Sequence, residues 1–304
     1  PPARRLASPL DRGAGQKRGL SLIMVFSALV SGLGLGSMYG LLALGFYITY
    51  SVSSTVNFAQ GSSMMLGAVF AYTFAVTYGW PMLPAVALAL ALCALYGVIV
   101  ELVAVRPFAR RGSNAWLMAT VALGILADNT VLFTFGKEPR GFAMPWAAGS
   151  VSIGGLNISP LQILIPVAGL ALAAALHAFS AGTKHGKALL AVVQNRDAAR
   201  LMGINVPLAI SGAYAASTVF AGAAGILIAP LFNVHSDMGT LFGLKAFAVA
   251  ILGGIASPWG VMLAGLLFGV TESMITAFLG SGYTQILSFT LVIAALALMP
   301  NGLF

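Results

Sequence analysis

The chain is built from continuous apolar runs of about 20 residues that follow one another with short breaks. A run of this length crosses the hydrocarbon core of a bilayer as a helix. A membrane barrel would instead need strands that alternate apolar and polar residues. Here the runs are unbroken, and only 7% of the 304 residues are charged, against about a quarter in a soluble domain. The chain is therefore predicted to be an all-α, polytopic helical membrane protein.

Eight of the runs have spanning length, and a ninth is shorter. The shorter run, at 241–255, ends in GGIASPWG, which indicates a half-helix, a re-entrant turn or a short crossing. We expect a single transmembrane domain over residues 20–304, with about eight transmembrane helices plus this segment. The eight predicted spans are 20–51, 61–79, 83–105, 115–135, 160–181, 206–230, 258–279 and 283–299.

The basic residues indicate how the chain is oriented. Residues 1–19 carry five of the fifteen basic residues together with Pro and Gly, which predicts a disordered basic tail. The net charge of +8 does not point to nucleic acid, because the other basic residues fall in short clusters between apolar runs. Two loops hold most of them, and the positive-inside rule places both in the cytoplasm. They are Arg106, Arg110 and Arg111 in one loop, and Lys184, Lys187, Arg196 and Arg200 in the other.

The loop at 136–159 is balanced in charge and is expected outside. The side of the N-terminal tail depends on the first run. If 20–51 is one helix, parity places the tail outside, against the charge rule. A break into two crossings near GLGLGS is the alternative.

Three glycines lie four residues apart in the first run, in GLGLGSMYG. That spacing places Gly32, Gly36 and Gly40 on one helix face, where small residues let two helix backbones approach closely in lipid. We therefore interpret them as a helix-packing face rather than a ligand site.

A polar stretch, NFAQGSS, interrupts the apolar pattern after the first run. An unpaired hydrogen-bonding group in hydrocarbon is costly, so Asn57 and Gln60 need protein or water around them. With Gly61 beside them as a helix breaker, the stretch is interpreted as irregular backbone lining a protected or wet cavity of the substrate pathway. Interhelical hydrogen bonding is the alternative.

Ionisable groups also occur inside the predicted spans. Glu272, and Asp128 with Asn129, are candidates for the substrate pathway, because intramembrane carboxylates usually face an interior or a water-filled space. A structural carboxylate bonded to backbone or hydroxyl groups is the alternative. Lys245 is expected to extend its amino group to the membrane interface.

No constellation of catalytic or metal-ligating residues is apparent. His177, His185 and His235 share no short ligand spacing, and the single cysteine, Cys93, lies in an apolar run. No Gly-rich loop is followed by Lys and Ser or Thr, so nucleotide hydrolysis by this chain is not expected. We expect neither an enzyme nor a bound metal, and an intramembrane enzyme is the least supported class.

The cytoplasmic loop at 184–204 differs from the other loops. It is charged and helix-forming over 187–202, and Gly203 follows where a helix would stop. A short amphipathic helix parallel to the membrane would offer Arg196, Asp197 and Arg200 to a soluble partner.

Five motifs occur in a fixed order: GLGLGSMYGLLALGF, VNFAQG, AVVQNRDAARLMGINV, GLKAFAVAILGGIASPWGVMLAGLLFGVTES and LMPNGLF. With them, the chain from about residue 29 to its end resembles the permeases of the branched-chain amino acid type of ABC importers. Members of that superfamily move branched-chain amino acids, urea, short amides, aromatic acids, sugars and nucleosides. One departure lies in the second motif, where relatives commonly carry His, Gly and Glu and this chain has Gln60, Gly61 and Ser62.

The resemblance implies a permease subunit in a bacterial-type inner membrane, moving a small polar solute by alternating access. It implies a second permease subunit, a paralogue or an identical copy, two cytoplasmic ATP-binding subunits that hold ATP and Mg, and an extracytoplasmic solute-binding protein. No cofactor is expected on this chain and no nucleic acid. The matched coupling positions on an ATP-binding subunit are Asp197, Ala198, Ala199 and Gly203, to which Lys187, Arg196 and Arg200 add the charged side chains.

An alternative from another class is a stand-alone transporter coupled to ions or protons. It would use Glu272 and Asp128 as coupling carboxylates. The partner-facing loop at 184–204 argues against it.

Overall fold

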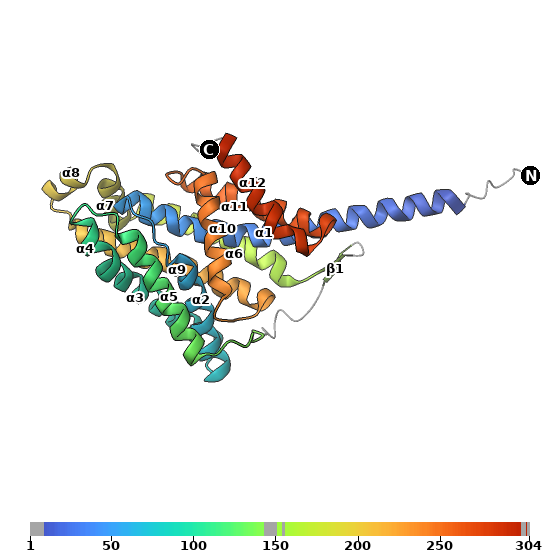
Figure 1. The fold of residues 1–304 in the computed structure, drawn as a ribbon, viewed down its shortest axis with the longest axis horizontal. Coiled ribbons are helices and arrows are strands. Elements are labelled where there is room, and N and C mark those ends of the chain that lie inside the picture. The colour runs from blue at the N-terminus through green and yellow to red at the C-terminus, as the bar shows by residue number, and fades with distance from the viewer. Residues whose placement is uncertain (1–8, 143–150, 154–155, 299–301, 303–304) are drawn as a thin grey trace, which may run out of the picture.

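The computed structural model describes residues 9–142, 151–153, 156–298 and 302, and it is almost wholly helical. The helices pack into one bundle, from which the N-terminal part of α1 projects (Figure 1). Two stretches, η1 and η2, are π-helical turns that continue α2 and α3. The helices are α1 (Pro9–Ser53), α2 (Gln60–Tyr72), η1 (Thr73–Thr77), α3 (Met82–Val100), η2 (Glu101–Val105), α4 (Arg106–Ala109), α5 (Trp116–Thr134), α6 (Pro160–Gly182), α7 (Lys184–Gln194), α8 (Arg196–Leu201), α9 (Val206–Phe232), α10 (Met238–Leu252), α11 (Pro258–Leu279) and α12 (Ser281–Leu298).

Every predicted span coincides with a helix, which confirms the polytopic all-α class. Within the described residues, six helices are long and apolar enough to cross a membrane. The shorter apolar helices are Met238–Leu252 and Ser281–Ala295, and the predicted span at 61–79 is formed by α2 with η1. The six longer ones are Ile23–Ser53, Met82–Ala109, Trp116–Thr134, Pro160–Gly182, Val206–Phe232 and Pro258–Leu279.

Helix α1 is continuous through GLGLGS, so the alternative of two crossings is wrong. Its C-terminal end lies beside α8, where Arg196 Nη2 donates to Ser54 Oγ at 3.3 Å. Its N-terminal part therefore lies at the opposite end of the bundle. The helix begins at Pro9 and so includes residues 9–19 of the predicted tail. Once a helix is nucleated, each further residue adds one hydrogen bond. Residues 1–8 of the predicted tail lie outside the described residues.

Helices α1 and α11 form the most extensive helix contact within the described residues, and small residues line it. A Cβ atom on Gly32 would lie 2.6 Å from the Cα of Val270, and one on Gly36 would lie 2.7 Å from the Cα of Leu266. No side chain fits in that space. The predicted face of glycines thus lies against the backbone of α11, as small-residue faces do in lipid.

Helix α10 is one continuous helix, and it contains no turn between Met238 and Leu252. It follows the loop in which Val234 exchanges two backbone hydrogen bonds with Arg140, at the end of the bundle away from α7 and α8. It ends at the turn formed by Gly254, with φ of 73°, and Trp259 of α11 then lies 5.8 Å, centroid to centroid, from His177 near α7. At about 1.5 Å per residue its 15 residues span about 22 Å.

The predicted outer loop at 136–159 contains a hairpin that the sequence did not predict. Strands β1 (Val151–Ile153) and β2 (Leu156–Ile158) pair antiparallel, with Ser152 opposite Asn157. Residues 143–150 and 154–155 of this loop lie outside the described residues.

Candidate functional site

The polar stretch between α1 and α2 lies inside the bundle. Ser54 has φ of 55°, in the left-handed region, and it turns the chain back toward the helices. The chain stays non-helical until Gln60. The hydroxyl of Ser217 on α9 contacts both the Gln60 side chain and the carbonyl of Gly45 on α1. Since Gly45 precedes the end of α1 by eight residues, Gln60 lies about 12 Å below that end.

The side chains of Asn57 and Gln60 are fully buried and bonded to protein groups. Gln60 Nε2 donates to the Ser217 carbonyl at 3.1 Å, and Asn57 Nδ2 donates to Gln60 Oε1 at 3.4 Å. Ser217 Oγ lies 3.0 Å from Gln60 Oε1 and 2.8 Å from the Gly45 carbonyl. Gly61 lies against α10, with its Cα 2.9 Å from where a Cβ of Gly243 would be. This arrangement is the interhelical hydrogen bonding left open as the alternative, and it joins α1, α2 and α9.

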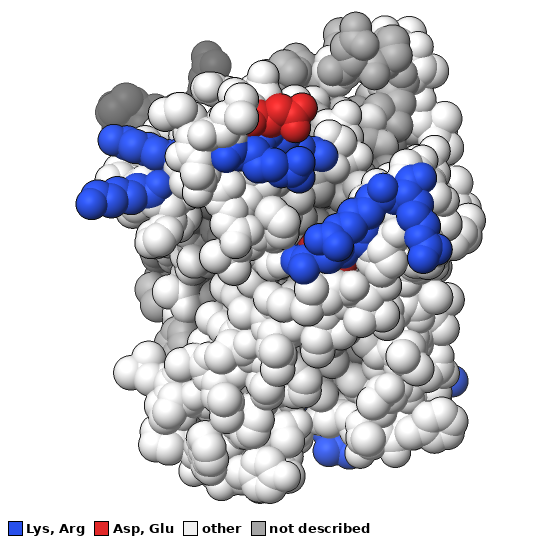
Figure 2. Space-filling model, turned by 90° about the vertical axis from the view of Figure 1, so that its left-hand side faces the viewer, with Lys and Arg blue, Asp and Glu red and all other residues white. Residues whose placement is uncertain are grey.

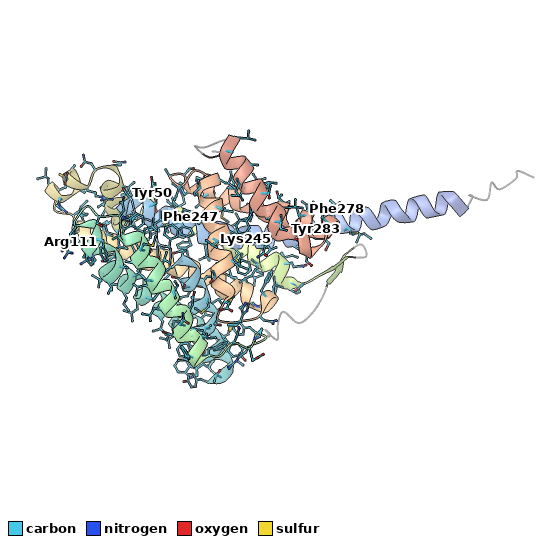
Figure 3. The ribbon with its side chains drawn as sticks, viewed as in Figure 1. Tyr50, Arg111, Lys245, Phe247, Phe278 and Tyr283 are labelled. Carbon is cyan, nitrogen blue, oxygen red and sulfur yellow. The ribbon has the colours of Figure 1, made fainter. Side chains whose placement is uncertain are left out.

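A second buried cluster contains Glu272 and overturns the expectation for Lys245. The Lys245 side chain lies inside the bundle (Figure 3), with 8% of its surface exposed, and it forms an ion pair with Glu272. Tyr39 donates its hydroxyl to the other oxygen of Glu272 at 2.9 Å. A buried charge needs an opposite charge and hydrogen bonds, and Glu272 supplies both. The cluster joins α10 to α1 and α11.

A third cluster, missed by the sequence analysis, contains a carboxylate at the start of η2. Glu101 is 2% exposed and accepts two hydrogen bonds of 2.8 Å from Arg106, from Nε and from Nη2. The π-helical turn makes this possible, because the N–H of Arg106 bonds to the carbonyl of Glu101 and places both residues on one face. Ser211 of α9 lies 2.9 Å from Glu101 and 2.7 Å from Arg106. The available signal was an acid five residues before the first arginine of the loop.

The remaining pathway candidates lie on α5. Asn129 is exposed, and its Nδ2 donates to the Ile125 carbonyl of its own helix at 2.8 Å. Asp128 is half-buried, and its Oδ1 has no hydrogen-bond partner among the described residues. The structure therefore groups Asn57, Gln60 and Gly61, and places Glu272 in a separate cluster. Asp128 and Asn129 are bonded to neither cluster.

The loop at 184–204, expected in the cytoplasm, forms two short helices instead of the single predicted one. Asn195 separates α7 from α8, and its Oδ1 accepts the N–H groups of Asp197 and Ala198, both at 3.0 Å. Such an N-cap starts a new helix, which is why α7 ends there. Gly203, with φ of 84°, follows the end of α8. We name α7 and α8 together the α7–α8 segment.

The α7–α8 segment presents charge on its outside and contacts the bundle on its inside. The side chains of Asp197 and Arg200 are 92% and 65% exposed, whereas Ala199 is buried. The loop after α4 lies at the same end, and Figure 2 shows the basic side chains gathered there. We name this the basic end. Its basic residues are Arg106, Arg110, Arg111, Lys184, Lys187, Arg196 and Arg200.

Residues 28–296 match the family model described as branched-chain amino acid transport system / permease component. The chain belongs to this family. The match begins within α1, so the projecting start of that helix precedes the part shared with the family.

Individual permeases are similar over almost their whole length. The chain is 29% identical over 288 residues to the high-affinity branched-chain amino acid transport system permease protein LivH of Escherichia coli, with 90% of this chain and 94% of LivH covered. It is 32% identical over 292 residues to BraD of Pseudomonas aeruginosa, a permease of the same description, with the same coverage. It is 27% identical over 277 residues to the ribose import permease protein RbsC of Escherichia coli, covering 87% of this chain and 83% of RbsC. The chain is thus a multi-pass permease component, and its relatives are transport subunits rather than enzymes.

Proposed function

We propose that this permease carries a small polar solute through the membrane as part of an ATP-driven importer. Branched-chain amino acids are the first candidate, because LivH and BraD carry that substrate in their names. Other amino acids, urea, amides and small organic acids follow, since Gln60 and Ser62 give the second motif no charge of its own. The α7–α8 segment, exposed on one side and packed against the bundle on the other, is the observation that carries the proposal.

The α7–α8 segment reaches the buried polar stretch by two physical routes. Arg196 of α8 contacts Ser54, which begins the non-helical stretch leading to Gln60. Gly203 leads directly into α9, which carries Ser217, the partner of Gln60. A shift of α8 driven by a partner would therefore act on both sides of one hydrogen-bonded contact. Such coupled shifts of packed helices are one way in which alternating access is produced.

The assembly that fits this role has a second permease subunit, two ATP-binding subunits that hold ATP and Mg, and an extracytoplasmic solute-binding protein. In a bacterial-type inner membrane the basic end would face the cytoplasm by the positive-inside rule. The ATP-binding subunits would then meet the α7–α8 segment, and the binding protein would meet the end that carries β1 and β2.

A stand-alone transporter coupled through Glu272 loses its main support. Both oxygens of Glu272 are bonded, one to Lys245 and one to Tyr39, so this carboxylate is held by protein groups.

Charge reversal in the α7–α8 segment tests the proposal. Asp197→Arg and Arg196→Glu should each lower the ATPase activity stimulated by the solute-binding protein by roughly 5-fold or more in the assembled complex, the lower limit of a typical coupling energy. Arg111→Glu is the matched control, an exposed reversal at the same end outside the segment, and should leave stimulation within about 2-fold. Elution as an intact complex in size-exclusion chromatography shows that the variants assemble. Full stimulation in both α7–α8 variants would contradict the docking role.

A further inference from the structure

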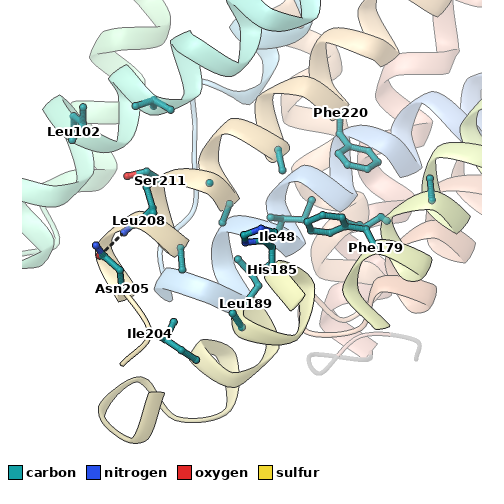
Figure 4. A pocket seen from close by; sticks show the side chains of 18 of the residues that line it. Ile48, Leu102, Phe179, His185, Leu189, Ile204, Asn205, Leu208, Ser211 and Phe220 are labelled. Atoms are coloured by element: carbon teal, nitrogen blue, oxygen red, sulfur yellow. Dashed lines mark hydrogen bonds between the residues drawn. The ribbon is translucent and has the colours of Figure 1, made fainter. Parts of the chain in front are cut away.

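A cavity of about 1070 Å³ lies at the basic end, beneath the α7–α8 segment. It lies between α1, α3 with η2, α6, α7 and α9, and Figure 4 shows Leu102 facing Phe179 and Leu189 from the opposite side. Nearly all of its lining is apolar. The apolar side chains drawn with labels in Figure 4 are Ile48, Leu102, Phe179, Leu189, Ile204, Leu208 and Phe220.

The apolar lining is continuous with helix surface exposed at membrane depth. Leu208, Phe179 and Leu102 are 68%, 46% and 43% exposed although they belong to membrane-spanning helices. Such surface faces lipid or another protein, and a packed membrane protein does not leave a space of this size unfilled.

The same cavity is also lined by polar groups. Arg106 lines it, and its Nε and Nη2 are held by Glu101 and Ser211, whereas its Nη1 donates no hydrogen bond within the described residues. His185 and Asn205 line the cavity as well. An immobilised guanidinium with a free edge is suited to a phosphate group.

We propose that this cavity binds an anionic phospholipid of the cytoplasmic leaflet. An acyl chain fills the apolar part, and the phosphate accepts hydrogen bonds from Arg106 and His185. Lys184 and Lys187, both exposed on α7, add attraction to a negative headgroup. Charge complementarity favours this occupant over an apolar helix of the partner permease, because Arg106 lines the cavity and Lys184 and Lys187 are exposed on α7 beside it. A polar import substrate does not fit the apolar lining.

A larger residue at Gly212 would fill the cavity. Gly212 lines the cavity, and a Cβ atom built on it meets nothing within 4 Å, so Gly212→Leu introduces bulk without a clash. Gly282 of α12 is equally open and lies outside the cavity, which makes Gly282→Leu the matched control.

The experiment is native mass spectrometry of the assembled complex after equilibration with equal amounts of phosphatidylglycerol and phosphatidylcholine of identical acyl chains. The unaltered complex should retain phosphatidylglycerol at least about 5-fold over phosphatidylcholine, in line with about 1 kcal/mol per basic side chain near the surface. Gly212→Leu should abolish this preference, His185→Ala should reduce it, and Gly282→Leu should preserve it.

Four results would overturn the proposal: no headgroup preference in the unaltered complex, an unchanged preference in Gly212→Leu, displacement of the lipid by inorganic phosphate at constant ionic strength, or photo-crosslinking of position 212 to the second permease chain. The proposal does not depend on which solute is imported, so it stands or fails separately from the proposed function.

Discussion

The amino group of Lys245 and the carboxylate of Glu272 are 27 residues apart in sequence and form an ion pair inside the bundle. With Tyr39 they show how single residues make charge tolerable at membrane depth. The pair has a measurable signature, because removing one partner of a buried ion pair costs far more than removing both.

Lys245→Met is expected to lower the free energy of unfolding by about 3–5 kcal/mol, because it leaves Glu272 charged and unpaired. The double variant Lys245→Met/Glu272→Gln should recover most of that loss, since no uncompensated charge remains. Thermal unfolding of the purified protein in detergent measures both. Equal losses in the single and double variants would show that the pair is not coupled.

Gln60→Leu is expected to destabilise the protein by about 1–3 kcal/mol, because the buried groups of Asn57 and Ser217 lose their partner. Ser63→Ala is the neighbouring control, since Ser63 Oγ donates to the carbonyl of Ala59, the N-cap of its helix, and to no other group among the described residues. It should cost less than about 1 kcal/mol. The same unfolding assay decides, and a control as destabilised as Gln60→Leu would argue against the interhelical contact.

Single-residue outcomes differ in how far the sequence could predict them. The depth of Asn57 and Gln60 follows from their position between apolar runs, but Ser217 lies 157 residues from Gln60, and the pairing is tertiary. The prediction that Lys245 extends to the membrane interface was wrong for the same reason. Its partner, Glu272, is distant in sequence, and a lysine without a known partner is expected at the interface. Glu101 was missed because only the π-helical turn brings it to Arg106.

Between elements, the small residues of α1 and α11 decide how closely the two helices approach. Gly36 has no room for a side chain, whereas a Cβ on Gly34 would meet nothing closer than the Gln162 carbonyl at 3.9 Å. Replacement by alanine is therefore expected to affect protein stability differently at these two glycines.

Gly36→Ala should destabilise the protein by about 1–3 kcal/mol, because the added methyl group forces the helices apart. Gly34→Ala should be neutral or slightly stabilising, since alanine favours a helix by up to about 1 kcal/mol over glycine. Melting temperatures of the two variants provide the comparison. A Gly36→Ala protein as stable as Gly34→Ala would mean that α1 and α11 do not pack as described.

Helix positions were predictable because run length and polarity determine them, whereas local breaks were not. The break at Asn195 depends on one side chain that caps two backbone N–H groups. Helix propensity does not include this contact, so it predicted one helix that continues through Asn195. The alternatives for 241–255 depend on the surroundings of its two ends, which no local pattern shows: Val234 bonds Arg140 before the helix, and Trp259 lies near His177 after it.

For the whole molecule, parity and the two basic loops agree on one orientation, whereas the basic N-terminal part of α1 departs from the charge rule. Both basic loops lie at the basic end, and the N-terminal part of α1 lies at the other (Figures 1 and 2). The turn at Gly254 lies beside Gly302, so the C-terminal end of the chain returns to the basic end.

Labelling of single cysteines measures this orientation. In a Cys93→Ala background, Lys137→Cys should react with a membrane-impermeant maleimide added to intact cells, and Arg111→Cys should react only after the membrane is opened, because the exposed side chains lie at opposite ends. The reverse pattern would invert the assignment and move the α7–α8 segment outside.

The central claim is that this chain forms the path of an ATP-driven importer. Proteoliposomes that contain the purified complex, with ATP inside and the loaded solute-binding protein outside, measure it through uptake of a radiolabelled branched-chain amino acid. We predict uptake that requires ATP, the binding protein and this chain together, and that Asp197→Arg lowers by roughly 5-fold or more. ATP-dependent uptake at an undiminished rate from a complex assembled without this chain would contradict the account.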